Sequence, residues 1–173
     1  MTGDPPPVLR GKRVTLRPVE SADVATLAEI LGEPEVARWY FASDPLASAQ
    51  EFLDDPDGVA LVIEADGEIV GSIQFYENTD PEYRHAGMDI FLTAERQGQG
   101  LGPESLRVLG RYLLDALGHH RLIIDPAAAN ERAIRAYESV GFRPVGIMRS
   151  SERGADGTFH DGLLMDLLAD ELS

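Results

Sequence analysis

A glycine-rich turn between an apolar segment and an amphipathic one restricts the fold of this chain more than any other stretch. The apolar segment 87–92 precedes the turn and the amphipathic segment 104–117 follows it, and the turn reads Gln97-Gly98-Gln99-Gly100-Leu101-Gly102. Alternate glycines remove Cβ atoms and let backbone N–H groups approach a ligand. Pro103 suits the first turn of a helix, and a helix N-terminus attracts anions. The pattern predicts a phosphate site, although a strand-to-helix turn that needs glycine only for its geometry explains it equally well.

The rest of the chain alternates between strand-like and helix-like patterns. Helical spacing predicts helices over 21–31, 103–117 and 131–140. A short helix is expected from Pro34, carrying Trp39 to Phe41. Another is expected after Asp44, which is placed as an N-cap. Asp66-Gly67 predicts a tight hairpin. The predicted strands are 13–17, 59–64, 68–76, 86–93, 121–125, 143–149 and 159–168. We therefore expect an α/β (α+β) fold, with a mixed, mostly antiparallel sheet of six to seven strands flanked by about four helices. The chain is expected to form one domain over 12–173, after a flexible arm over 1–11.

Composition narrows the classes of partner. The chain has 15 basic and 30 acidic residues, a net charge of −15, which argues against nucleic acid and anionic membranes and is compatible with a cationic partner or simply an acidic surface. It has no cysteine, which excludes disulfides, thiolate metal sites and a covalent cysteine intermediate, and no metal site is predicted. There is no apolar run of the roughly 18 residues that a membrane span needs, and Met1 to Pro7 lacks the features of a signal peptide. The expected location is the cytoplasm.

Two strand–helix units are expected to share one crevice. The strands 86–93 and 121–125 both end where a helix follows, so the glycine turn and Asn130 can meet at the carboxyl ends of the strands. Tyr137 lies two helical turns after Asn130 on the same face. A phenol, with a usual pKa near 10, can protonate a thiolate leaving group. A tyrosine packed in the core with its hydroxyl hydrogen-bonded is the alternative.

These residues resemble the GCN5-related N-acetyltransferases. Residues 97–102 fit that family's Q/R-x-x-G-x-G/A motif, and 130–142 are similar to its N-x-x-A-x-x-x-Y-x-x-x-G-F motif. The resemblance covers about residues 12–168 and implies acetyl-CoA as the cofactor. It implies that the backbone of Gln97, Gly98, Gln99, Gly100, Leu101 and Gly102 binds the pyrophosphate and that strand 86–93, with Ile90 and Leu92, pairs with the pantetheine arm. Asn130 would contact that arm, Tyr137 would protonate the departing thiolate, and Arg132 would supply positive charge, as would Arg96 and Arg135.

The acceptor amine must lose a proton before or as it attacks, so a carboxylate near the thioester is expected. Asp89 interrupts an apolar strand, where an unpaired carboxylate is costly, which makes it a candidate base. With no cysteine, direct transfer in a ternary complex is simpler than a covalent relay.

A narrower resemblance, to the aminoglycoside 6′-N-acetyltransferases, bears on the acceptor. It rests on the segments 14–17, 36–40, 79–81, 87–89 and 125–135. It implies that Asp89 and Asp125 contact acceptor amines and that Trp39 and Tyr40 lie on the acceptor side. Glu77 stands in an acidic loop that could steer a polycation, and the alternative is a solvated loop without a function. For Asp125, the alternative is a strand-ending residue that hydrogen-bonds locally in a turn.

The tail departs from this pattern. Residues 152–161, with His160 and Asp161, are similar to the ribosomal-protein N-terminal acetyltransferase branch. The leading interpretation is therefore an N-acetyltransferase of a small polycationic amine, most specifically an aminoglycoside 6′-amine. The alternatives are an enzyme for a protein α-amine or a siderophore or metabolite amine, and a CoA-binding regulatory module. A monomer and a homodimer are both compatible with the sequence.

Overall fold

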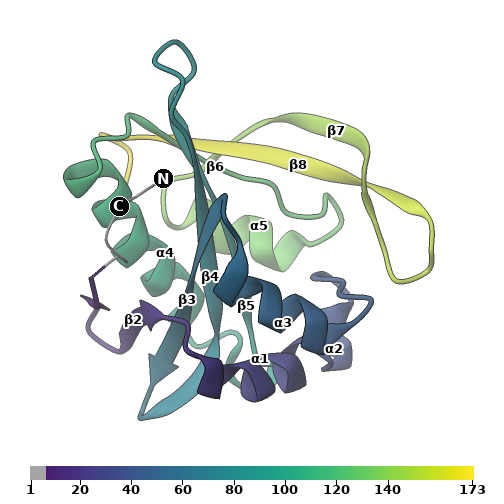
Figure 1. Ribbon diagram of the computed structural model, residues 1–173. Coiled ribbons are helices and arrows are strands. Elements are labelled where there is room, and N and C mark those ends of the chain that lie inside the picture. Colours follow the sequence, from purple (N-terminus) through teal and green to yellow (C-terminus); the bar gives the residue numbers. More distant parts are fainter. Residues whose placement is uncertain (1–6) are drawn as a thin grey trace.

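An eight-stranded sheet forms the centre of the computed structural model, which describes residues 7–173 (Figure 1). The strand order is β1-β2-β3-β4-β5-β6-β8-β7, and every neighbouring pair is antiparallel except β5 and β6. The strands are β1 (Leu9–Arg10), β2 (Val14–Pro18), β3 (Gly58–Ala65), β4 (Glu68–Asn78), β5 (His85–Leu92), β6 (Arg121–Ile124), β7 (Arg143–Arg153) and β8 (Phe159–Leu168).

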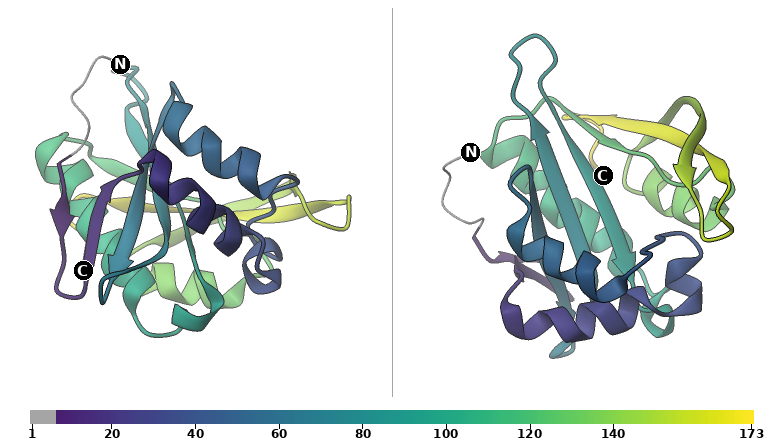
Figure 2. Two further views of the ribbon diagram at one scale, coloured as in Figure 1. Left: turned by 60° about the horizontal axis from the view of Figure 1, so that its bottom comes forward. Right: turned by 45° about the vertical axis from the view of Figure 1, so that its right-hand side comes forward.

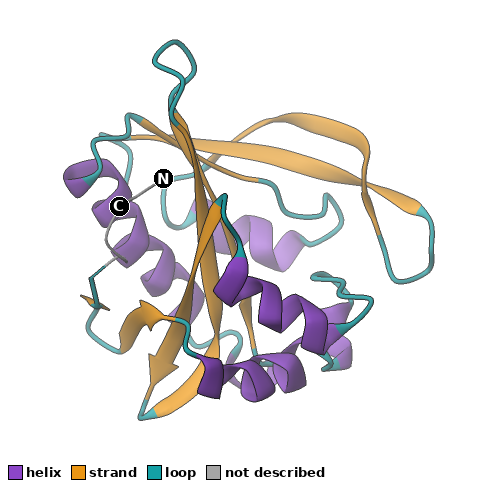
Figure 3. Cartoon of the chain, viewed as in Figure 1, coloured by secondary structure: helices purple, strands orange, loops and turns teal. Residues whose placement is uncertain are grey.

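Helices cover both faces of the sheet, as Figures 2 and 3 show. The helices α1, α2 and α3 pack on one face, where Leu27, Val36 and Phe91 belong to one buried apolar cluster. The helices α4 and α5 pack on the other face over a larger cluster that includes Leu106 and Phe142. The bounds are α1 (Val24–Leu31), α2 (Pro34–Ala37), α3 (Pro45–Asp54), α4 (Leu101–Arg111) and α5 (Glu131–Glu138).

Side chains of β5 alternate between these two layers, as the period of a strand requires. Met88 and Ile90 pack in the cluster under α4 and α5. Phe91 packs in the cluster under α1, α2 and α3. Asp89, two residues from Phe91, therefore points to the α1–α3 face of the sheet.

The parallel pairing of β5 with β6 is short, and this opens the sheet. Only Ala86 with Leu122 and Gly87 with Ile123 are in register. Beyond them the two strands separate, and no strand of the described residues pairs with β5 on the β6 side from Asp89 onward. A gap in the middle of a sheet connects its two faces, and the ligand crevice of an open α/β sheet lies at such carboxyl ends.

Most predicted elements are present, with four corrections. The sheet has eight strands instead of six to seven, because Leu9–Arg10 of the predicted arm pairs with β2; residues 1–6 of that arm lie outside the described residues. Glu20 and Asp23, not Ser21, cap the turn before α1. The second helix ends at Ala37, so Trp39 to Phe41 follow it. The strand predicted over 143–149 continues to Arg153.

Local signals explain the elements that were predicted well. Asp44 Oδ1 accepts hydrogen bonds from the N–H groups of Leu46 and Ala47, both at 3.1 Å, and caps α3. Asp66 and Gly67 both have positive φ, as a two-residue hairpin turn requires. The helix predicted over 103–117 begins at Leu101 and ends in one π-helical turn, Tyr112–Ala116.

Candidate active site

The glycine turn forms an uncapped helix N-terminus, as the sequence indicates. Gly98 and Gly100 have φ of +74° and +82°, values that favour glycine. Gly100 is the N-cap of α4, and within the described part of the chain, 7–173, no side chain caps the helix. A Cβ at Gly98 would meet no atom within 4 Å, so this side of the turn is open. The first N–H groups of α4 are thus free for an anion.

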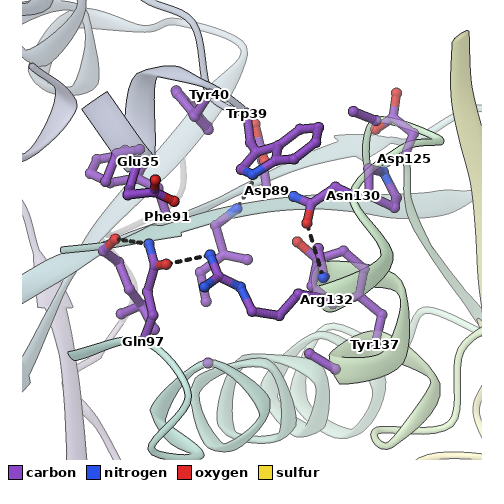
Figure 4. A pocket seen from close by; sticks show the side chains of 18 of the residues that line it. Glu35, Trp39, Tyr40, Asp89, Phe91, Gln97, Asp125, Asn130, Arg132 and Tyr137 are labelled. Carbon is purple, nitrogen blue, oxygen red and sulfur yellow. Dashed lines mark hydrogen bonds between the residues drawn. The ribbon is translucent and has the colours of Figure 1, made fainter. Parts of the chain in front are cut away.

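Neighbouring side chains hold the turn in place. The Arg13 Nη1 donates to the Gln99 carbonyl oxygen at 2.6 Å. The Gln97 Nε2 donates to the Leu92 carbonyl oxygen at 2.8 Å, and Arg132 donates to the Gln97 Oε1. These bonds keep the turn rigid and fix one guanidinium beside it (Figure 4).

A cavity of about 620 Å³ begins at this turn and continues through the gap between β5 and β6. It joins the α4–α5 face of the sheet to the α1–α3 face. The sequence-predicted residues that line it are Trp39, Tyr40, Asp89, Ile90, Leu92, Gln97, Gly98, Gly100, Gly102, Asp125, Asn130, Arg132 and Tyr137.

Three predicted site residues do not line the cavity. Glu77 Oε2 lies 2.6 Å from Nε2 of the buried His119, so Glu77 joins the base of the β4–β5 hairpin to the segment before β6. Leu101 is 1% exposed and belongs to the core under α4. Gln99 is exposed, and it can contribute only its backbone to the turn.

Two of the arginines expected to supply positive charge are also engaged elsewhere. Arg96 pairs with Asp66 at 2.6 Å, and it lies outside the cavity. Arg135 is exposed and lies 3.4 Å from Glu131 on the same helix. Arg132 is the one of the three that lines the cavity.

Asn130 both caps α5 and lines the cavity. Its Oδ1 accepts the N–H of Ala133 at 3.2 Å and caps α5. The same side chain lines the cavity, and its amide nitrogen makes no hydrogen bond among the residues 7–173. A donor is therefore available to a ligand that passes along β5.

Asp89 lies at the centre of the cavity, between Trp39 and Asn130 (Figure 4). Its carboxylate is accessible to water from the cavity, although the atoms of the cavity walls surround it closely. This burial raises the pKa of Asp89 to about 7, and the negative charges of Asp125 and Glu152 also raise it. The Ile90 N–H, which donates to Oδ1 at 2.9 Å, opposes the rise. A carboxylate with a pKa near neutrality is suited to general-base catalysis.

A chain of buried polar groups lies behind Asp89. Gln74 of β4 stands directly opposite Asp89 in the sheet. The Tyr40 hydroxyl donates to the Gln74 Oε1 at 2.8 Å, and the Gln74 Nε2 donates to the Ser72 Oγ at 2.9 Å. Ser72, which is fully buried, donates to the Leu61 carbonyl oxygen. These bonds fix the Tyr40 ring beside Asp89.

Tyr137 reaches the cavity from α5, on the opposite face of the sheet to Asp89. It is 8% exposed, so it packs in the core and lines the cavity at the same time. Burial raises the pKa of Tyr137 above its usual value, and the charges of Asp89 and Asp125 add to this. The phenol therefore keeps its proton at neutral pH and can donate it.

Sequence reasoning missed two acidic residues that line the cavity, Glu35 of α2 and Glu152 of β7. Burial raises the pKa of Glu152, and the charge of Asp125 raises it further. No local motif marks either residue. Their position depends on how α2 and the β7–β8 hairpin pack, which the sequence pattern does not show.

Known proteins of one family are similar to this chain over most of its length. The family model described as acetyltransferase (GNAT) domain matches residues 13–143, which is most of the chain. An aminoglycoside N(6′)-acetyltransferase type 1 of Klebsiella pneumoniae is 30% identical over 159 residues, covering 80% of this chain and 78% of that protein. A spermidine N(1)-acetyltransferase of Escherichia coli is 28% identical, with coverage of 75% and 72%. YdaF of Bacillus subtilis, named as a ribosomal N-acetyltransferase, is 25% identical, with coverage of 91% and 89%.

A solved structure with a bound donor has the same fold. The structure of AAC(6′)-Ib with paromomycin and acetyl-CoA superposes with a TM-score of 0.75 at 27% identity, over 92% of this chain and 96% of the other. The glycine turn and Tyr137 of α5, which belong to the two sequence motifs, line one cavity in this chain. This chain belongs to the GNAT acetyltransferase family.

Proposed function

We propose that this protein transfers the acetyl group of acetyl-CoA to a primary amine of a small polycationic acceptor, with an aminoglycoside 6′-amine as the most specific candidate. One observation carries the proposal: Asp89 of β5, Asp125 just after β6 and Glu152 of β7 line one cavity, and the charge of Asp125 raises the pKa of both Asp89 and Glu152. Clustered carboxylates repel one another, and an acceptor with several ammonium groups removes that repulsion. The −15 net charge agrees with such a substrate.

The residues of the glycine turn fit the pyrophosphate of the donor. The uncapped N-terminus of α4 offers N–H groups, and Arg132 lies beside it. Ile90 and Leu92 line the cavity between this turn and Asp89, so they would contact the pantetheine arm with Asn130. Bound there, acetyl-CoA supplies an activated thioester at the gap in the sheet.

The two faces of the sheet would then divide the proton transfers. On the α1–α3 face, Asp89 would accept the proton that the amine nitrogen loses as its bond to the acetyl carbon forms. On the α4–α5 face, Tyr137 Oη would donate its proton to the sulfur as the thioester carbon–sulfur bond breaks. Transfer would be direct, within a ternary complex.

An acetyl-transfer screen tests the acceptor. The panel comprises kanamycin-class and neomycin-class aminoglycosides, spermidine and peptides with a free N-terminus. Because the chain has no cysteine, released CoA can be followed with a thiol reagent without background from the protein. We expect turnover of the aminoglycosides and the polyamine; turnover of the peptides alone would overturn the acceptor assignment.

A thermal-shift measurement tests the donor separately. Acetyl-CoA at 100 times its Kd should stabilise the protein by about 2.7 kcal/mol, whereas NAD should have no effect. Among the residues 7–173 no helix is long and apolar enough to cross a membrane. The cytoplasmic location and the oligomeric state, monomer or homodimer, stay predictions.

A further inference from the structure

The edge strand β7 contains an irregularity that the proposed reaction does not by itself explain. Met148 stands opposite Gly162 and Glu152 stands opposite His160, so β7 advances four residues where β8 advances two. Within this bulge, Ser150 has a φ of +51°, which non-glycine residues rarely adopt. A bulge bends its strand and changes the direction of its side chains.

Asp161 of β8 supports this unusual backbone. Its Oδ1 accepts the N–H of Ser150 at 2.8 Å. Its own carbonyl oxygen accepts the N–H of Ala128 at 2.8 Å, in the segment that follows β6. One residue thus joins the bulge to the segment that follows Asp125, and the bulge is fixed relative to the cavity.

The bulge is followed immediately by residues that line the cavity. Ser151 and Glu152 do so although β8 separates β7 from β6 in the sheet. Figure 1 shows the hairpin of β7 and β8 extending beyond the end of β6, toward the α2 side of the molecule. Side chains of a strand point alternately to its two faces, and a bulge changes the direction of the side chains that follow it. The direction of the Glu152 side chain therefore depends on the two additional residues in β7.

We infer that Glu152 is a specificity-determining residue that binds a second ammonium group of the acceptor, and that Asp161, through the Ser150 bulge, is its positioning residue. The inference rests on the proposed function. Asp89 serves the amine that is acetylated, so it cannot also stay paired with a cation throughout the reaction. Glu152 approaches from another strand, and its partly buried charge would select acceptors that carry two or more positive charges.

The charges in the cavity support this assignment. All three carboxylates line the same cavity. The charge of Glu152 raises the pKa of both Asp89 and Tyr40, and the charge of Asp125 raises the pKa of Glu152. His160 stands opposite Glu152 and lowers the pKa of Glu152. The ring of His160 pairs with Asp156 at 3.0 Å, not with Glu152. A monoamine can neutralise only one of the three carboxylates.

The test compares Glu152→Gln with the wild type on hexylamine, 1,4-diaminobutane, spermidine and kanamycin. We expect kcat/KM for the acceptors with several amines to fall about 10-fold or more, mainly through KM, as when one partner of a charge pair is removed. We expect kcat/KM for hexylamine to change much less than kcat/KM for the acceptors with several amines, and we expect the Kd for acetyl-CoA to stay unchanged. Glu51→Gln makes the same charge change on the exposed face of α3 and is the matched control. It should alter neither kcat/KM for any acceptor nor the Kd for acetyl-CoA.

Two further variants test the positioning role. Asp161→Asn keeps an oxygen that can accept the Ser150 N–H and should retain the preference for polyamines, whereas Asp161→Ala should lose it as Glu152→Gln does. Thermal melts confirm that each variant is folded. If Glu152→Gln lowered kcat/KM equally for hexylamine and spermidine, or lowered it for neither, the inference would be overturned while the proposed function stayed intact. If the wild type acetylated no amine on the panel, the proposed function itself would fail.

Discussion

Replacing Asp89 by asparagine should lower activity and raise stability, and these opposite effects distinguish a catalytic base from a structural residue. The pKa of Asp89 in the folded protein is about 7, against 3.8 for an unperturbed aspartate. An acid with a raised pKa binds its proton more tightly in the folded state. Its ionisation therefore destabilises the fold progressively as the pH rises from about 4 to about 7, and the cost is constant above that range.

The size of the stability effect follows from this difference. A difference of about 3 pKa units corresponds to about 4 kcal/mol at 1.36 kcal/mol per unit. Because the carboxylate is open to water in the cavity, screening reduces this to about 1–2 kcal/mol. We expect Asp89→Asn to raise the Tm by about 2–6 °C at pH 8 and by much less at pH 5. Asp170→Asn, at an exposed turn, is the control and should not shift the Tm.

The kinetic effect should have a matching pH dependence. In the wild type, kcat/KM should fall as the pH drops below about 7, because Asp89 takes up a proton and can no longer act as a base. Asp89→Asn should reduce kcat by about 100-fold or more and should remove this acidic limb. The reasoning is refuted if the variant is less stable than the wild type at pH 8, or if an unchanged acidic limb remains in its profile.

Two further variants test the donor side. Tyr137→Phe should lower kcat by about 100-fold or more with little change in the Kd for acetyl-CoA, since it removes only the proton donor; equal losses in both would indicate packing. Gly100→Ala places a Cβ on a residue with a φ of +82°, a strain of about 1–2 kcal/mol. Calorimetry should show acetyl-CoA binding about 10-fold weaker, with kcat at saturation largely retained; unchanged binding would mean that the turn does not hold the donor.

The fold could be predicted well wherever a short signal determines an element. The hairpin at Asp66-Gly67 and the helix after Asp44-Pro45 are examples, since turn geometry and capping act over a few residues. The errors occur where packing decides. Leu9–Arg10 is too short to show a pattern and becomes a strand only because β2 offers an unpaired edge. β7 continues beyond residue 149 because Asp161 supports a bulge that propensity alone does not predict.

The candidate site divides in the same way. Two contiguous motifs, 97–102 and 130–137, supply most of the predicted residues that line the cavity, because each motif forms one local structure. Glu77 was assigned to the acceptor side on its acidity alone, and the fold pairs it with His119 instead. Glu152 has no local signal, since its place in the cavity depends on the register between β7 and β8.

The acceptor side is therefore a property of the fold more than of the overall composition. Asp89, Asp125 and Glu152 lie 36 and 27 residues apart in the chain, and they meet because β5 and β6 separate and the β7 bulge turns back. Most of the −15 charge lies on the surface, where salt screens it beyond about 8–10 Å, so it can speed the approach of a cation without choosing among amines. Selectivity among acceptor amines requires charges that are held in fixed positions and partly removed from water. In this molecule the three carboxylates that line the cavity meet that condition, whereas Glu77 is held against His119 outside the cavity.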